Sequence, residues 1–98
     1  MKILAIEKEI EGVKDEDYKP HLKAEAMRAW KLYQQGIIRD LYFTEKDHFG
    51  VLILECKNAD EANQYLNTLP LVKEGLIKFD VLPLIPYPGF ARLFNTES

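Results

Sequence analysis

Residues 36–56, GIIRDLYFTEKDHFGVLILEC, decide the fold of this chain. Two apolar runs, Ile37 to Thr44 and His48 to Cys56, flank the polar residues 45–47. Short runs rich in β-branched and aromatic residues predict strands, and a brief polar break between them predicts a turn. We therefore expect an antiparallel β-hairpin at the centre of the sequence.

The segments on either side of the hairpin supply two helices and two more strands. Upstream, Ile3 to Ile6 reads as a strand, and Pro20 to Gln35 reads as a helix that stops at Gly36. Downstream, a helix begins at Asn58, and Leu76 to Leu84 is the last strand. The order β-α-β-β-α-β predicts an α+β, ferredoxin-like domain, in which helices cover one face of a four-stranded antiparallel sheet.

Both helices carry apolar stripes that we expect to pack on the sheet. In the second helix, Asn58 is the expected N-cap with Glu61 as its capping-box partner, and Pro70 ends the helix. We expect Trp30 to lie in the core rather than to form a ligand platform. The stripes are Leu22, Ala26, Ala29 or Trp30, and Tyr33 in the first helix, and Ala59, Ala62, Leu66 and Leu69 in the second.

Several strands are apolar on both faces, which a lone sheet with helices on one side does not satisfy. A chain of 98 residues buries only about 60–65% of its unfolded surface, so oligomerisation is an expected way to complete its core. A second copy is the predicted cover for the free face. Two such sheets packed face to face form a homodimeric α+β barrel.

The last part of the chain differs in character from residues 1–86, which form the ferredoxin-like domain. Pro86 and Pro88 keep the backbone extended around Tyr87. Three large apolar side chains follow, and burial of each contributes roughly 1.5–3 kcal/mol. We therefore predict that residues 87–98 are a C-terminal tail that docks across the subunit interface. Its apolar groups are Phe90, Leu93 and Phe94.

Composition excludes several classes of partner. The net charge is −3, and positive and negative residues are interleaved along the chain. The basic stripe of nucleic-acid-binding proteins and the positive patch that attracts anionic membranes are therefore missing. The sequence has no signal-peptide pattern and no membrane-spanning length of apolar residues, and we expect a cytoplasmic protein.

The single cysteine, Cys56, excludes an internal disulfide and is expected to be buried and inert. Two histidines without metal-ligand spacing and five scattered glycines predict no metal site and no cofactor.

Residues 36–42, GIIRDLY, resemble the Gly-x-x-Arg-x-Leu-aromatic segment of the muconolactone isomerase family. The resemblance continues through residues 58–62, NADEA, and residues 69–71, LPL, and covers residues 36–80. It implies a dimeric α+β barrel, often assembled into larger rings. The family's type enzyme moves a double bond in a small lactone carboxylate by proton transfer, without metal or organic cofactor. Residues 20–22, PHL, also resemble the helix start of YCII-related proteins, which share the fold and for which a histidine–aspartate pair is the suggested chemistry.

Proton transfer needs a base near an acidic C–H and a donor for the developing oxyanion. Arg39 is the predicted substrate-binding residue, because its planar guanidinium group can donate two hydrogen bonds to one carboxylate. In the alternative interpretation, Arg39 pairs with Asp40 or Glu55 on the sheet. Tyr42 either offers its hydroxyl to the ligand or packs in the interface.

The predicted catalytic residues are His21, Glu55 and Asp80. His21, near the start of the first helix, is either a general base, the role for which histidine is most often used, or an exposed first-turn residue. A glutamate at a strand end, such as Glu55, is a base or is simply solvated. Asp80 shares a strand face with Lys78, and the two either form a cross-strand ion pair or line a cavity.

These residues lead to two hypotheses from different classes. The first is a cofactor-free isomerase or lyase that moves a proton in a small organic acid or lactone inside the barrel cavity. Arg39 would anchor the substrate carboxylate, and His21 or Glu55 would move the proton. The second is a non-catalytic ligand-binding or assembly module of the same fold. In this module, side chains pack over the faces of the sheet and the tail holds the subunits together.

Overall fold

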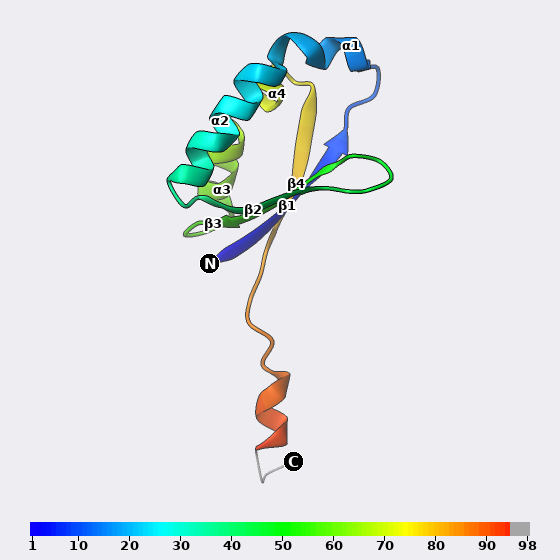
Figure 1. Ribbon diagram of the computed structural model, residues 1–98. Coiled ribbons are helices and arrows are strands. Elements are labelled where there is room, and N and C mark those ends of the chain that lie inside the picture. Colours follow the sequence, from blue (N-terminus) through cyan, green and yellow to red (C-terminus); the bar gives the residue numbers. More distant parts are fainter. Residues whose placement is uncertain (95–98) are drawn as a thin grey trace.

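The computed structural model describes residues 1–94, and in this part of the chain four strands and two longer helices make up most of the structure (Figure 1). The predicted order of strands and helices is confirmed, with short helical turns added. In chain order the elements are β1 (Lys2–Glu9), α1 (Asp15–Tyr18), the 3₁₀ turn η1 (Lys19–His21), α2 (Leu22–Gln34), β2 (Ile38–Phe43), β3 (Gly50–Glu55), α3 (Ala59–Leu66), α4 (Pro70–Lys73), β4 (Ile77–Pro83) and the 3₁₀ turn η2 (Gly89–Leu93).

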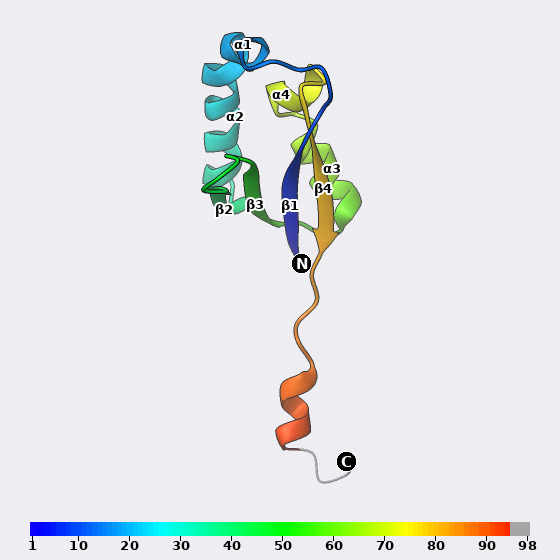
Figure 2. The ribbon, with the colours of Figure 1, turned by 90° about the vertical axis from the view of Figure 1, so that its right-hand side faces the viewer.

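The strands form one antiparallel sheet in the order β2-β3-β1-β4. Ala5 of β1 lies between Leu52 of β3 and Val81 of β4. The pairing of β2 with β3 is irregular between Ile38 and Asp40. Strands β2 and β4 are therefore the two edges of the sheet, and α2, α3 and α4 lie over one of its faces (Figure 2).

The core fills the space between this face and the helices. Along β3, the buried residues Leu52 and Leu54 alternate with the half-buried residues Val51 and Ile53, because successive side chains of a strand point to opposite faces. Cys56 is buried as predicted, and burial raises the pKa of its thiol, so it stays protonated and inert. The buried residues that form one contiguous cluster are Ile3, Ala5, Leu32, Ile38, Leu52, Leu54, Cys56, Ala62, Leu66 and Leu69.

The centre of the opposite face of the sheet is apolar too, as the sequence predicted. Leu4 and Ile6 of β1 point to this side together with Val51 and Ile53 of β3, and all four are half-buried. Among residues 1–94 no helix lies over them. We refer to this surface as the open face.

Helix α2 is rotated relative to the predicted stripe, and the prediction that Trp30 lies in the core is wrong. Leu32 is the buried residue of the helix, whereas Trp30 is 55% exposed and stacks on Tyr33 with 5.7 Å between ring centroids. Contacts from other elements explain the rotation. The Arg28 Nε–H donates a hydrogen bond to Thr68 Oγ1 at 2.8 Å, which turns this side of α2 toward the loop between α3 and α4.

The start of α3 follows the predicted capping pattern with one difference. Asn58 Oδ1 accepts a hydrogen bond from the Glu61 N–H at 2.9 Å, which confirms Asn58 as the N-cap. Glu61 Oε1 accepts from the Lys57 N–H at 3.1 Å, one residue before the amide expected in a capping box. The helix ends at Leu66, and Pro70 begins the separate short helix α4.

Replacing Asn58 by Ala is expected to lower the free energy of unfolding by about 1 kcal/mol, because the Glu61 amide loses its side-chain acceptor. Urea denaturation followed by circular dichroism measures this change. Asn63→Ala is the matched control, since Asn63 is exposed within the same helix, and it is expected to leave stability unchanged or slightly raised. Equal effects of the two substitutions would contradict the capping role.

Candidate functional site

A pocket of about 330 Å³ lies between α2 and the sheet. This volume is in the range of small-molecule sites, roughly 300–1,000 Å³. The wall is mainly apolar, and its mouth lies beside edge strand β2, where Phe43 is 70% exposed. Two carboxylates, Glu7 from β1 and Glu25 from α2, are the ionisable groups in the lining. An apolar pocket with a few convergent polar groups is the usual form of a ligand or active site.

Glu25 has the properties of a general base. One of its carboxylate oxygens, Oε1, accepts a hydrogen bond from the Leu71 N–H at 2.9 Å, which fixes the side chain against α4. Burial raises the pKa of Glu25, and the negative charge of Glu7 raises it further, while the Leu71 bond and the nearby His21 oppose the rise. A carboxylate with a raised pKa is a stronger base than a solvated one.

Glu7 reaches the pocket because it continues the inward alternation of Ile3 and Ala5 along β1. Its Oε1 atom accepts a hydrogen bond from the Gly50 N–H at 2.8 Å. A Cβ at position 50 would lie 3.2 Å from this oxygen, so the absence of a side chain at Gly50 permits the close approach. The bond holds the carboxylate at one end of the pocket.

Sequence reasoning missed both carboxylates of the pocket. The predicted first strand stopped at Ile6, although the alternation of Ile3 and Ala5 already put the next inward position at Glu7. Glu25 lies one turn of helix from Leu22 and Ala29, which line the same pocket. A charged residue within an apolar helical stripe was the available signal.

His21 is the one predicted catalytic residue that lies near the pocket. It ends η1, precedes α2 directly and is half-buried. It stands four residues, about one helical turn, before Glu25, and its charge lowers the pKa of that carboxyl. The structure therefore brings His21 and Glu25 to the same region.

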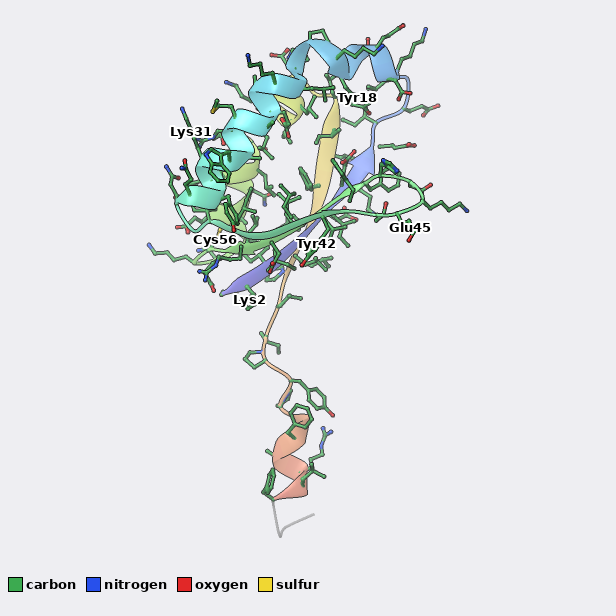
Figure 3. The ribbon with its side chains drawn as sticks, in the orientation of Figure 1. Lys2, Tyr18, Lys31, Tyr42, Glu45 and Cys56 are labelled. Atoms are coloured by element: carbon green, nitrogen blue, oxygen red, sulfur yellow. The ribbon has the colours of Figure 1, made fainter. Side chains whose placement is uncertain are left out.

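The predicted residues Tyr42 and Asp80 lie on the open face instead. Tyr42 is 61% exposed, and Figure 3 shows it on the side of the sheet away from α2. Asp80 Oδ2 lies 3.4 Å from Lys8 Nζ, so the cross-strand ion pair is made with Lys8 rather than with Lys78. Both side chains of this pair are exposed, and such a pair adds little stability.

Arg39 and Glu55 lie at the far end of the hairpin strands from the pocket. Arg39 is exposed at the irregular part of β2. Glu55 Oε2 accepts a hydrogen bond from the N-terminal amino group at 2.6 Å. This bond is the main cause of the lowered pKa of Glu55, with smaller contributions from Lys2 and Arg39. Glu55 is therefore a weak base, and the roles predicted for these two residues would need a second site at the open face.

Two negative findings apply to the described part of the chain. Within residues 1–94, no three His, Cys, Asp or Glu side chains are grouped so that they could hold a metal ion. In the same range, no helix has the length and apolar character needed to span a membrane.

Comparisons with known proteins support the fold. No protein-family model matches the sequence, and no curated protein matches it. A solved structure, 5-chloro-2-hydroxyhydroquinone dehydrochlorinase (TftG) from Burkholderia phenoliruptrix AC1100 in complex with 2,5-dihydroxybenzoquinone, superposes with a TM-score of 0.68. The match covers 91% of this chain and 98% of that chain at 19% identity. The chain and this dehydrochlorinase therefore share the predicted α+β, ferredoxin-like fold.

Proposed function

We propose that this protein is an enzyme that transfers protons in small organic molecules, with the pocket between α2 and the sheet as its active site and Glu25 as the general base. The observation that supports this proposal most strongly is the state of Glu25. Its carboxylate is half-buried in an apolar pocket, is fixed by the Leu71 N–H, and has a raised pKa. Perturbed carboxylates of this kind are enriched at catalytic sites.

The pocket favours a small oxygenated ring over an organic anion. Its apolar lining suits the ring, and the two carboxylates, Glu7 and Glu25, repel a negatively charged group. Arg39, which the sequence suggested as a carboxylate anchor, lies at the far end of β2 from Phe43 at the pocket mouth. We therefore propose cyclic ketones and lactones as the substrate class, because both carry an acidic C–H next to a carbonyl. The 2,5-dihydroxybenzoquinone in the complex of the dehydrochlorinase of the same fold is likewise a single ring with oxygen substituents.

The proposed chemistry begins with the Glu25 carboxylate removing a proton from an acidic C–H of the bound ring. In an isomerisation, the electron pair of that bond moves to an adjacent carbonyl as an enolate, and Glu25 returns the proton to a different carbon. In an elimination, the electron pair forms a new C=C bond while the leaving group departs with its own bonding pair. His21, one turn from Glu25, is proposed to exchange the proton of Glu25 with solvent after an elimination.

Hydrogen–deuterium exchange tests the shared first step of both reactions. The full chain is incubated in D₂O with a panel of small cyclic ketones and lactones, and exchange at carbon is followed by proton NMR. At least one member is expected to exchange faster with the protein than with buffer alone. Binding without faster exchange would favour a non-catalytic binding module, and neither binding nor exchange would contradict the proposed active site.

We also propose that two copies pair through their open faces to form a homodimeric barrel. The apolar side chains of this face, such as Ile6 and Ile53, stand on the two central strands, where a partner sheet would exclude water from them. The same face supports the second candidate function, an assembly module without catalysis. The exchange experiment separates the two candidates, because an assembly module has no need of the base at Glu25.

A further inference from the structure

The tail that follows β4 carries large apolar side chains that its own chain leaves in water. The structure describes this tail as far as Phe94, and residues 95–98 of the predicted tail lie outside the described residues. The segment from Ile85 to Phe94 points away from the domain (Figures 1 and 2). Phe94 is 83% exposed. Exposed apolar groups gathered on one short segment mark an interaction site. The exposed members are Ile85, Tyr87, Phe90, Leu93 and Phe94.

The tail is ordered locally, although it makes few contacts with the domain. The rings of Tyr87 and Phe90 meet edge to face with 5.0 Å between their centroids. The Tyr87 ring covers Gly89, where a Cβ would collide with it. Two prolines, Pro86 and Pro88, restrict the backbone around this ring pair. A segment that is already shaped loses less conformational freedom when it docks.

The mouth of the pocket is a second exposed apolar surface. Leu41 and Phe43 line the pocket from edge strand β2 and remain exposed, and Leu22 does the same from α2. Trp30 lies eight residues after Leu22, and the spacing of four places both on the same side of α2. Trp30 and Tyr33 are also exposed. We call these five residues the mouth surface. On this side the lining residues of the pocket are exposed to solvent.

Within one chain, the tail leaves the sheet far from the mouth surface. The tail follows β4, whereas the mouth lies beside β2 at the opposite edge of the sheet. Strand β4 ends at Pro83 opposite Ile3, while the pocket lies further along the strands, where Phe79 pairs with Glu7. A tail that points away from this end of the sheet is placed to reach a neighbouring molecule instead.

Charge also matches the tail to the pocket. From Ile85 to Phe94, the one charged residue of the tail is Arg92. The ionisable groups in the pocket lining are the carboxylates of Glu7 and Glu25. A cation brought to the mouth would therefore meet charge of the opposite sign.

We propose that the tail of a second copy covers the pocket mouth, so that each active site is completed by its partner. The rings of Tyr87 and Phe90 lie on the mouth surface, and Arg92 faces the pocket. Closure removes water from the apolar pocket, which strengthens every electrostatic interaction inside it. The tail is thus a lid supplied in trans.

Disulfide trapping tests this arrangement in the full chain, with Cys56→Ala as the background. A chain carrying Phe43→Cys is mixed with a chain carrying Phe90→Cys under mild oxidation. A cross-linked dimer of the two chains is expected on a non-reducing gel. The control replaces the first chain by Gln64→Cys, on the exposed surface of α3, and is expected to cross-link at most a tenth as much.

Two cross-linking results would overturn the proposal. One is cross-linking of the Phe43→Cys and Phe90→Cys mixture at the level of the Gln64→Cys control. The other is a disulfide within a single chain when both substitutions are on the same molecule, because the tail would then cover its own pocket. Trp30, the sole tryptophan, gives a readout that needs no cysteine. Its emission is expected to shift to longer wavelength when Phe90, Leu93 and Phe94 are all replaced by Ser, and an unchanged spectrum would also contradict the lid.

The two experiments can refute the lid and the proposed reaction independently of each other. If cross-linking fails while deuterium exchange persists and depends on Glu25, the tail docks elsewhere and the active site stands. If cross-linking succeeds while no compound binds or exchanges, the tail covers the pocket and the proposed chemistry is wrong.

Discussion

Replacing Glu25 by Gln is expected to lower the protein-catalysed exchange rate by about 10²–10⁴-fold, the contribution typical of a positioned general base. Gln is nearly the same size, and its amide oxygen can still accept the Leu71 N–H bond. It has no carboxylate to take the proton from carbon. Exchange in D₂O, measured at saturating concentration of the best compound of the panel, gives the rate.

The matched control is Glu74→Gln, because Glu74 is exposed and follows α4. This variant is expected to catalyse exchange at the wild-type rate.

A stability measurement checks that the Glu25→Gln variant folds. The pKa of Glu25 is higher in the folded protein than in the unfolded chain. Protonated Glu25 therefore stabilises the fold at a pH below its unfolded-state pKa, and this stabilisation is lost as the pH rises through its folded-state pKa. The variant is therefore expected to be at least as stable as the wild type at neutral pH. A folded variant with unchanged exchange would contradict the role of Glu25.

Replacing Ile53 by Glu is expected to weaken association of two copies by about 10²–10³-fold, which corresponds to roughly 3–4 kcal/mol. Ile53 lies at the middle of the open face on β3. A carboxylate there would be buried without a partner when two sheets close over it, and unpaired buried charge is strongly disfavoured. Light scattering or analytical ultracentrifugation over a range of concentrations measures the change.

Gln64→Glu on the exposed side of α3 introduces the same charge far from the open face and is the control. The wild type and this control are expected to have the mass of two or more chains. The Ile53→Glu variant is expected to have the mass of one chain at the same concentration. A wild-type protein that is a monomer at high concentration would contradict pairing through the open face.

Local sequence signals predicted the parts of the fold that local interactions form. The hairpin follows from alternation on either side of a polar break, and the start of α3 follows from the side chain of Asn58, which bonds an amide three residues away. The rotation of α2 could not be predicted in this way. It depends on Arg28 meeting Thr68 and on Glu25 meeting Leu71, pairs that are separated by 40 and 46 residues.

The candidate site was harder to predict for a similar reason. A search for polar residues inside apolar strands led to Arg39, Tyr42 and Asp80, which lie at or near the open face of the sheet or at its edge. The pocket instead uses Glu7 at the end of a strand and Glu25 on a helix. These two carboxylates line one pocket only when α2 is packed on the sheet, and no local sequence pattern predicts that placement. Of the five residues predicted, His21 is the one near the pocket.

A carbon NMR titration of the Glu25 carboxyl, with and without the compound that exchanges fastest, tests Glu25 as the general base of this pocket most directly. We expect the pKa of Glu25 to lie above the ordinary value for glutamate, because the carboxyl is buried. We also expect the compound to shift the signals of Glu25, Ala26 and Ala29 while those of Tyr42 stay in place. Titration of Glu25 in the ordinary range, with compound-induced shifts confined to Tyr42 and Arg39, would contradict this role of Glu25.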